Sequence, residues 1–253
     1  MQAFIRVKFP TFAASALALA CAGMAPALNA AKPAPGGGGS TTTAAHSSCR
    51  ASALRVDSLP LLGFLEPVTA NKQAPDDGDP CVSDGQVLLA VPAGIVNADV
   101  LVAETAAKPV GAFPAHAKGF AVGVNVGLDP VLLNVSAGVL DARARVRGVA
   151  GKCVLSAESS VLGAAVVIGG VPVPLPSPLI TNTVEINVPL VGTLHLNKTL
   201  TTPNRITQRA LWLQVTDPLQ MALGLKDVVV AEATADFEGG TRCDEPRKPV
   251  NLR

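Results

Sequence analysis

The run 227–237, Asp-Val-Val-Val-Ala-Glu-Ala-Thr-Ala-Asp-Phe, most constrains what this chain can fold into. One set of alternate positions is apolar: Val229, Ala231, Ala233, Ala235 and Phe237. The positions between them are mostly polar: Val230, Glu232, Thr234 and Asp236. This period of two predicts a β-strand with one buried and one wetter face. Most of the preceding chain repeats the pattern, so the sequence predicts an all-β protein.

Further strands are expected at 51–58, 86–91, 98–103, 120–126, 140–147, 153–161, 164–168, 184–188, 194–197 and 211–215. A long loop through Pro60, Pro67, Pro75 and Pro80 separates the first two. The Pro-bound run 171–174 fits an edge or a crossover. One short helix is expected after Asp217, with Pro218 as its first residue and Gly224 as its stop. Many short strands with turn signals favour an antiparallel β-sandwich-like domain.

The first thirty residues, 1–30, are typical of a secretory signal peptide. Arg6 and Lys8 form its positive start, the apolar run 12–20 follows, and small residues then offer cleavage sites. The apolar run is too short for a transmembrane helix and soon meets Pro26, so we expect no transmembrane segment in the mature chain. The chain is therefore predicted to be secreted or held at the cell surface, outside the cytoplasm.

The leader contains an alternative signal at Cys21. The run 17–21, Leu-Ala-Leu-Ala-Cys, is similar to a bacterial lipobox, in which the cysteine is lipidated, although Ala18 stands where leucine is usual. Plain secretion and lipid anchoring both stay open. Residues 31–48 are rich in Pro, Gly, Ser and Thr and predict a flexible linker, which leaves 49–253 as a single all-β domain.

Four cysteines remain after the leader: Cys49, Cys81, Cys153 and Cys243. An even count in an exported chain favours two disulfides, and the absence of a C-x-x-C spacing disfavours a metal site. Four cysteines allow three connectivities. We prefer Cys49 with Cys81 and Cys153 with Cys243.

Charge and motifs exclude several functions. The formal net charge is +1, which gives no basic footprint for nucleic acid. His46 lies in the linker, His116 is expected in a loop and His195 on the polar face of a strand. None of the three is part of a nucleophile-elbow, metalloprotease or phosphate-loop motif. A triad assembled from distant residues is the alternative, but the chain is predicted not to be an enzyme.

Three polar features are candidate binding sites. Asp76, Asp77, Asp79 and Asp84 offer oxygen ligands for calcium, against the simpler interpretation of a solvated turn and no cofactor. Arg143, Arg145 and Arg147 could bind an anionic cell-envelope polymer, against pairing with cross-strand carboxylates. Trp212 could stack on a sugar, against packing at a core or edge.

Three segments carry a family resemblance: 139–153 followed by Val-Pro-Val at 171–173, then 183–197, then 210–215 followed by 227–233. This part of the chain resembles the bacterial exported choice-of-anchor proteins, most nearly the choice-of-anchor P type. That resemblance implies an exported β-rich region and no particular activity. Two departures are Asn197-Lys198-Thr199 in place of an Asn-Glu-Gln step and the lack of a hydrophobic tail after the last strand.

The sequence thus predicts an exported, non-enzymatic β domain of the cell envelope or the exterior, with a structural or binding role and an unidentified ligand. Its partner is expected to be a cell-envelope polymer or a second copy, since Val- and Ala-rich strands can add edge to edge. The alternative is a lipid-anchored surface protein with an unrecognised hydrolase or sugar-binding site.

Overall fold

The computed structural model describes residues 45–59, 63–72, 74, 78–93, 96–129, 132–149, 152–176, 183–222 and 227–238. These residues belong to one unit, Thr41–Arg253. Cys21, Asp76, Asp77 and Cys243 lie outside the described residues, as do the predicted signal peptide and all but the end of the predicted linker. The expectations attached to them stay predictions.

Six antiparallel strands form one sheet, which we call sheet A, in the spatial order β10-β11-β12-β13-β1-β2. Their bounds are His46–Leu59 for β1, Gly63–Ala70 for β2, Val184–Val188 for β10, Gly192–Thr201 for β11, Arg205–Val215 for β12 and Val228–Glu238 for β13. The alternating run 227–237 thus forms β13, which lies inside the sheet between β12 and β1.

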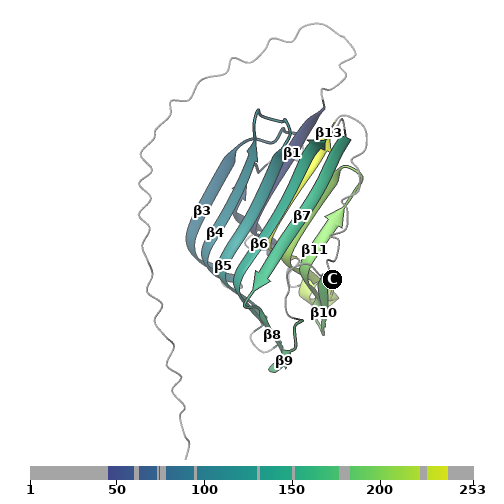
Figure 1. Ribbon diagram of the computed structural model, residues 1–253. Coiled ribbons are helices and arrows are strands. Elements are labelled where there is room, and N and C mark those ends of the chain that lie inside the picture. The colour runs from purple at the N-terminus through teal and green to yellow at the C-terminus, as the bar shows by residue number, and fades with distance from the viewer. Residues whose placement is uncertain are drawn as a thin grey trace, which may run out of the picture. The chain divides into compact units, whose positions relative to one another are not determined.

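Seven antiparallel strands form sheet B, in the order β3-β4-β5-β6-β8-β9, with β7 also paired to β6. Their bounds are Asp84–Ala93 for β3, Val96–Ala107 for β4, Ala115–Asp129 for β5, Leu133–Val149 for β6, Lys152–Leu162 for β7, Ala165–Ile168 for β8 and Val171–Val173 for β9. Figure 1 shows β3 to β7 side by side in the nearer sheet.

The two sheets pack against each other, so the all-β sandwich prediction is confirmed. Small and branched side chains fill the interior: Ala51, Ala121, Ala142, Ala144 and Ala233 are all fully buried. Phe113 and Phe237 pack at one end with ring centroids 5.3 Å apart. A core of this kind lets the sheets approach closely, since alanine methyl groups need little room between them.

Three expectations are corrected. The segment 59–85, whose prolines predict a loop, contains strand β2. This strand lies at the edge of sheet A, where a proline such as Pro67 is tolerated because its missing N–H faces away from the sheet. Strand β1 begins at His46, inside the predicted linker. His116 lies in β5 and not in a loop, because the alternation of that strand starts at Ala115.

The predicted helix is confirmed as α1, Pro218–Ala222. The Asp217 carboxylate accepts hydrogen bonds from the backbone amides of Leu219 (2.9 Å) and Gln220 (3.1 Å), as an N-cap does. Gly224, the predicted stop, lies outside the described residues. Among the helices that the structure describes, none is long and apolar enough to cross a membrane.

Strands of sheet A reverse their inside–outside phase along one row of residues. In β12 the buried residues are Ile206 and Gln208 before the row and Leu211 and Leu213 after it. The row comprises Ala53, Asn197, Ala210 and Ala231, which stand side by side in the register and are skipped by the pairing. Asn197 and Ala231 have φ of 55° and 54°. We call this set the reversal row of sheet A.

Two findings correct the expectation for β13: the polar residues of its predicted exposed face are buried, and the phase reversal moves Val230 from that face to the interior. Its predicted wetter face is buried, with Glu232 3%, Thr234 7% and Asp236 6% exposed. Val228 and Val230 are cross-strand neighbours of the buried Leu213 and Leu211, whereas beyond Ala231 it is Ala233 and Ala235 that lie beside the buried Gln208 and Ile206. Sheet B has a corresponding row at Asp99, Gly123, Gly138 and Gly163, where the buried parity of β4, β5 and β6 also changes.

Candidate functional site

Strand β6 divides its side chains as the sequence predicts. Leu140, Ala142, Ala144 and Val146 are fully buried between the sheets. Asp141, Arg143, Arg145 and Arg147 alternate with them and therefore lie on the outer face of sheet B. This outward-facing row of charges is the candidate binding surface.

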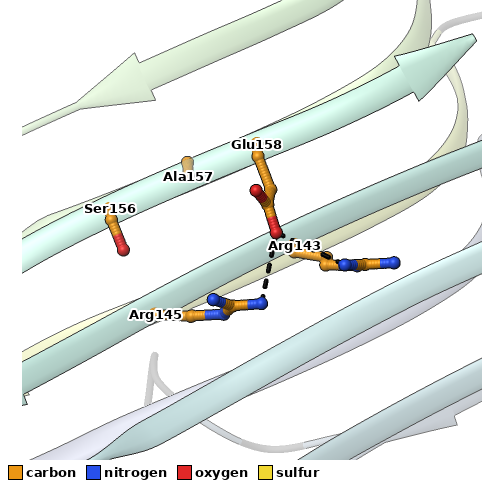
Figure 2. Close-up of a pocket in the computed structure, with 5 residues that line it drawn as sticks. All are labelled: Arg143, Arg145, Ser156, Ala157 and Glu158. Carbon is orange, nitrogen blue, oxygen red and sulfur yellow. Dashed lines mark hydrogen bonds and ion pairs between the residues drawn. The ribbon is translucent and has the colours of Figure 1, made fainter. Parts of the chain in front are cut away.

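Carboxylates pair with two of the three arginines. Arg143 Nη2 lies 2.7 Å from Asp141 Oδ2, and Glu158 Oε1 lies 3.4 Å from Arg143 Nη1 and 3.2 Å from Arg145 Nη2. Figure 2 shows the Glu158 carboxylate reaching both guanidinium groups from β7. They line a cavity of about 50 Å³ with Ser156 and Ala157. The pairing interpretation is correct for Arg143 and Arg145, and the cavity is far smaller than a typical ligand site.

Arg147 is different, because it is exposed and makes no ion pair with any residue that the structure describes. It is the next residue after Arg145 on the same face of β6, and it lies near the start of β5, because Ala115 pairs with Val146. There a cavity of about 320 Å³ is lined by Ala106, Ala107, Lys108, Pro114 and His116. Lys108 is exposed and likewise has no ion-pair partner within the described ranges.

His116 connects the cavity to the arginines. It pairs across β5 and β6 with Arg145 and across β4 and β5 with Ala106. Burial lowers the pKa of His116 below its ordinary value of 6.5, and the positive charges of Arg145 and Arg147 lower it further, while Glu104 opposes them. We name the set Lys108, His116, Arg145 and Arg147 the basic corner.

The basic corner has the chemistry of an anion site. Lys108 and the titratable imidazole of His116 line a space of ligand size. Arg145 lies opposite His116 on β6, and the positive charges of Arg145 and Arg147 both act on the imidazole. His116 makes no hydrogen bond to a described serine, cysteine or carboxylate, so the described part of this site offers no activated nucleophile. Lys108 was missed in the sequence because nothing in the sequence places the 107–114 turn beside β6.

A second polar network lies on the outer face of sheet A. Glu232 Oε1 lies 2.7 Å from Arg55 Nη1 and 3.5 Å from Arg50 Nη1, and Glu232 Oε2 lies 2.6 Å from Arg209 Nε. Arg50 also pairs with Glu66. All five side chains are buried to 15% exposure or less. The charges satisfy one another, which makes this cluster a structural one.

His195 and Trp212 extend that network. They are cross-strand neighbours with ring centroids 4.8 Å apart, and Arg209 lies 4.4 Å from the Trp212 ring on β12. Trp212 Nε1 donates to Asp227 Oδ2 at 3.0 Å. His195 and Trp212 do not line any of the cavities described in this section. The packing interpretation of Trp212 therefore fits its surroundings better than a sugar platform, whose aromatic face would have to be open.

The cysteine prediction is confirmed for its first pair. Cys49 and Cys81 form a disulfide across a sequence separation of 32 residues, with Cα atoms 4.8 Å apart. Cys81 is also held to β1 by its amide, which donates to the Ser47 carbonyl at 2.8 Å. Cys153 is disulfide-bonded as well. Its predicted pairing with Cys243 stays a prediction.

The predicted calcium loop is only partly described. Both carboxylate oxygens of Asp84 accept backbone amides, from Asn71 at 2.9 Å and from Gly85 at 2.8 Å. The backbone carbonyl of Asp79 accepts the Ser48 hydroxyl at 2.7 Å. Within the described ranges no three histidine, cysteine or acidic side chains gather as metal ligands. Asp84 thus has a local structural task, and the calcium site stays a prediction.

The chain matches no family model, no curated protein and no solved structure in the comparisons made.

Proposed function

We propose that this chain is an extracytoplasmic, non-catalytic binding module that contacts an anionic polymer of the cell envelope at the basic corner. The observation that carries the proposal is the pair Lys108 and Arg147. Both are exposed and neither is neutralised by a described carboxylate. Lys108 lines the 320 Å³ cavity together with His116, and the charge of Arg147 acts on His116 from β6. Phosphate, sulfate and carboxylate groups spaced along a polymer are the ligands that such cations attract.

Location is supported by the Cys49–Cys81 disulfide, since disulfides persist mainly outside the cytoplasm. The signal-peptide pattern in 1–30 and the resemblance to choice-of-anchor proteins favour the same compartment. Intact-mass measurement of the protein from its native compartment tests the leader. A mature start between Ala27 and Lys32 is the expected result, and a diacylglyceryl mass on Cys21 would replace free secretion by lipid anchoring.

Binding is tested with inorganic polyphosphate as the probe, with neutral dextran as the blank. The variant Lys108→Gln/Arg147→Gln should bind polyphosphate about tenfold more weakly than the parent, because two exposed charge contacts are together worth about 1–2 kcal/mol. Binding should weaken as salt rises and screens the charges.

A matched control removes the same total charge elsewhere. Lys72→Gln/Lys198→Gln changes two lysines outside the basic corner, one in the turn after β2 and one on β11. It should leave the affinity within about twofold, since only distant and screened charges are lost. Equal losses in the two double variants, or no polyphosphate binding by the parent, would refute the site.

A further inference from the structure

Strand β3 forms one edge of sheet B and pairs with β4 alone (Figure 1). Along such an edge, alternate residues direct their N–H and C=O groups away from the sheet, where another strand can bind them. From Gly85 to Val91 the strand has no charged residue and no proline. Val87 is 65% exposed and Leu89 68%.

The other described edges carry the features that prevent strand addition. Strand β2 contains Glu66 and Pro67, and its pairing with β1 has register shifts. Strand β9 has three residues with a central Pro172, and β10 has five residues with Glu185 at its second position. Strand β7 carries Glu158 and begins at Lys152. Short length, charge, proline and bulges are the usual guards of edges, and the segment 84–89 of β3 has only Asp84 at its start.

Side chains of β3 also close the neighbouring edge of sheet A. Gln86 Oε1 accepts the backbone amide of Thr69 at 3.2 Å, and Asp84 Oδ2 accepts that of Asn71 at 2.9 Å. The amide of Thr69 in β2 and that of Asn71 just after it are therefore capped within the chain, whereas no described residue caps the outer side of β3 in the same way.

We propose that a second copy of this chain pairs antiparallel with β3 over residues 85–89, with Val87 on the two-fold axis. In this register Val87 faces its own copy and Leu89 lies opposite Gly85, so a large side chain meets a residue without one. Residues opposite each other share a face, so exposed Val87 and Leu89 of both copies cover one another. The interface is isologous, as in most homodimers.

Charge placement supports the same register. The two Asp84 carboxylates fall just outside opposite ends of the paired segment, about 20 Å apart at about 3.3 Å per residue. That separation is more than twice the Debye length of about 8 Å at physiological ionic strength, so their repulsion is screened. One added strand pair is a small interface of the weak class, below about 1,200 Å². This association involves no residue of the basic corner and does not depend on the proposed function.

Sedimentation velocity over about 1 µM to 1 mM tests the pairing, a range that brackets weak protein interfaces. The parent should pass from monomer to dimer. Val87→Lys and Val87→Glu should each stay monomeric with unchanged melting temperature, because each places like charges opposite each other on the axis. An equimolar mixture of the two should dimerise, because lysine then faces glutamate.

Two control variants separate this arrangement from others. Val171→Lys changes a valine of equal exposure, 65%, on β9 and should leave dimerisation unchanged. Leu162→Lys lies on β7 in the same outer-face row as Leu89, through Val100, Val122 and Val139, and is 51% exposed. Dimerisation lost with Leu162→Lys would indicate face-to-face stacking and overturn edge pairing. A parent that stays monomeric, or a mixture that does not dimerise, would also overturn the proposal.

Discussion

Gly119 of β5 lies directly against the main chain of Glu232 in β13, across the interface of the two sheets. A Cβ atom built on Gly119 would stand 2.5 Å from the Glu232 carbonyl oxygen and 2.7 Å from that of Ser52. Both are backbone atoms, which cannot swing aside as a side chain can. At this point the sheets are in contact through their backbones, and the spacing of the sandwich is set by the absence of a side chain.

Replacing Gly119 by alanine should therefore destabilise the protein. Overpacking of a close-packed interior typically costs about 1–3 kcal/mol, and here the obstacle is backbone, so we expect a value at the upper end. Gly127→Ala in the same strand is the matched control, since its Cβ would meet nothing within 4 Å. Chemical denaturation gives both unfolding free energies, and equal values would contradict the contact.

Glu232→Gln should destabilise strongly. The substitution leaves Arg50, Arg55 and Arg209 without their shared carboxylate, at side-chain exposures of 13–15%. Breaking a buried ion network by removing one partner typically costs about 3–5 kcal/mol. Glu158→Gln is the control, because its side chain is 59% exposed while it also bridges two arginines, and exposed pairs contribute about 0–1 kcal/mol. Similar losses in urea denaturation would show that the cluster is solvated.

Removing the Cys49–Cys81 disulfide should lower stability by about 2–4 kcal/mol, since the cross-link restricts the unfolded chain. The double variant Cys49→Ala/Cys81→Ala tests this by thermal or urea denaturation. Thiol titration in denaturant should find no free thiol in protein from its native compartment, in keeping with two disulfides. Four reactive thiols would disprove the disulfide framework.

His116 should make both stability and polyanion binding depend on pH. Its folded-state pKa is lowered by burial and by Arg145 and Arg147, so the unfolded chain takes up the proton first. Stability is therefore complete above the ordinary pKa of 6.5 and falls as the pH drops through that value toward the folded pKa. Polyphosphate beside the imidazole favours its charged form, so affinity should rise over the same range.

His116→Gln should remove that part of the pH dependence from both measurements. Lys108→Gln should bind more weakly at every pH but keep the pH profile. A profile that is the same in the parent and in His116→Gln would assign the titration to another group.

Calcium should leave the melting temperature unchanged, because both oxygens of Asp84 already accept backbone amides. A ligand that binds the folded state alone raises the melting temperature by mass action. A rise on adding calcium that is reversed by chelator would instead establish the site predicted from Asp76, Asp77, Asp79 and Asp84.

Local alternation was sufficient to predict much of the fold. The faces of β6 follow directly from Leu140 to Arg147, and the Asp217 cap gave α1 its start. It failed for β13, because an unbroken period of two puts Val229 on the face of Ala233, whereas the extra residue Ala231 reverses the phase. A local pattern contains no signal for an extra residue whose partners lie in other strands.

The candidate site was less predictable for the same reason. The sequence indicates the arginine stripe, but the ion pairs depend on the sheet register, which places Glu158 of β7 beside Arg143 and Arg145 and places Val154 opposite Arg147. Lys108 joins the site only through the fold of the chain between β4 and β5. Arginines only two positions apart in the sequence therefore acquire different roles according to their cross-strand neighbours.

The reversal row of sheet A bears on how this chain can change by insertion and deletion. Deleting Ala231 alone would leave a regular alternation in β13 but would put its pairing with β1 and β12 out of register by one residue. The mismatch disappears only when Ala53, Asn197 and Ala210 are deleted too. Homologous chains are therefore expected to possess all four residues or none of them, so that single-residue gaps in their aligned strands occur as a set.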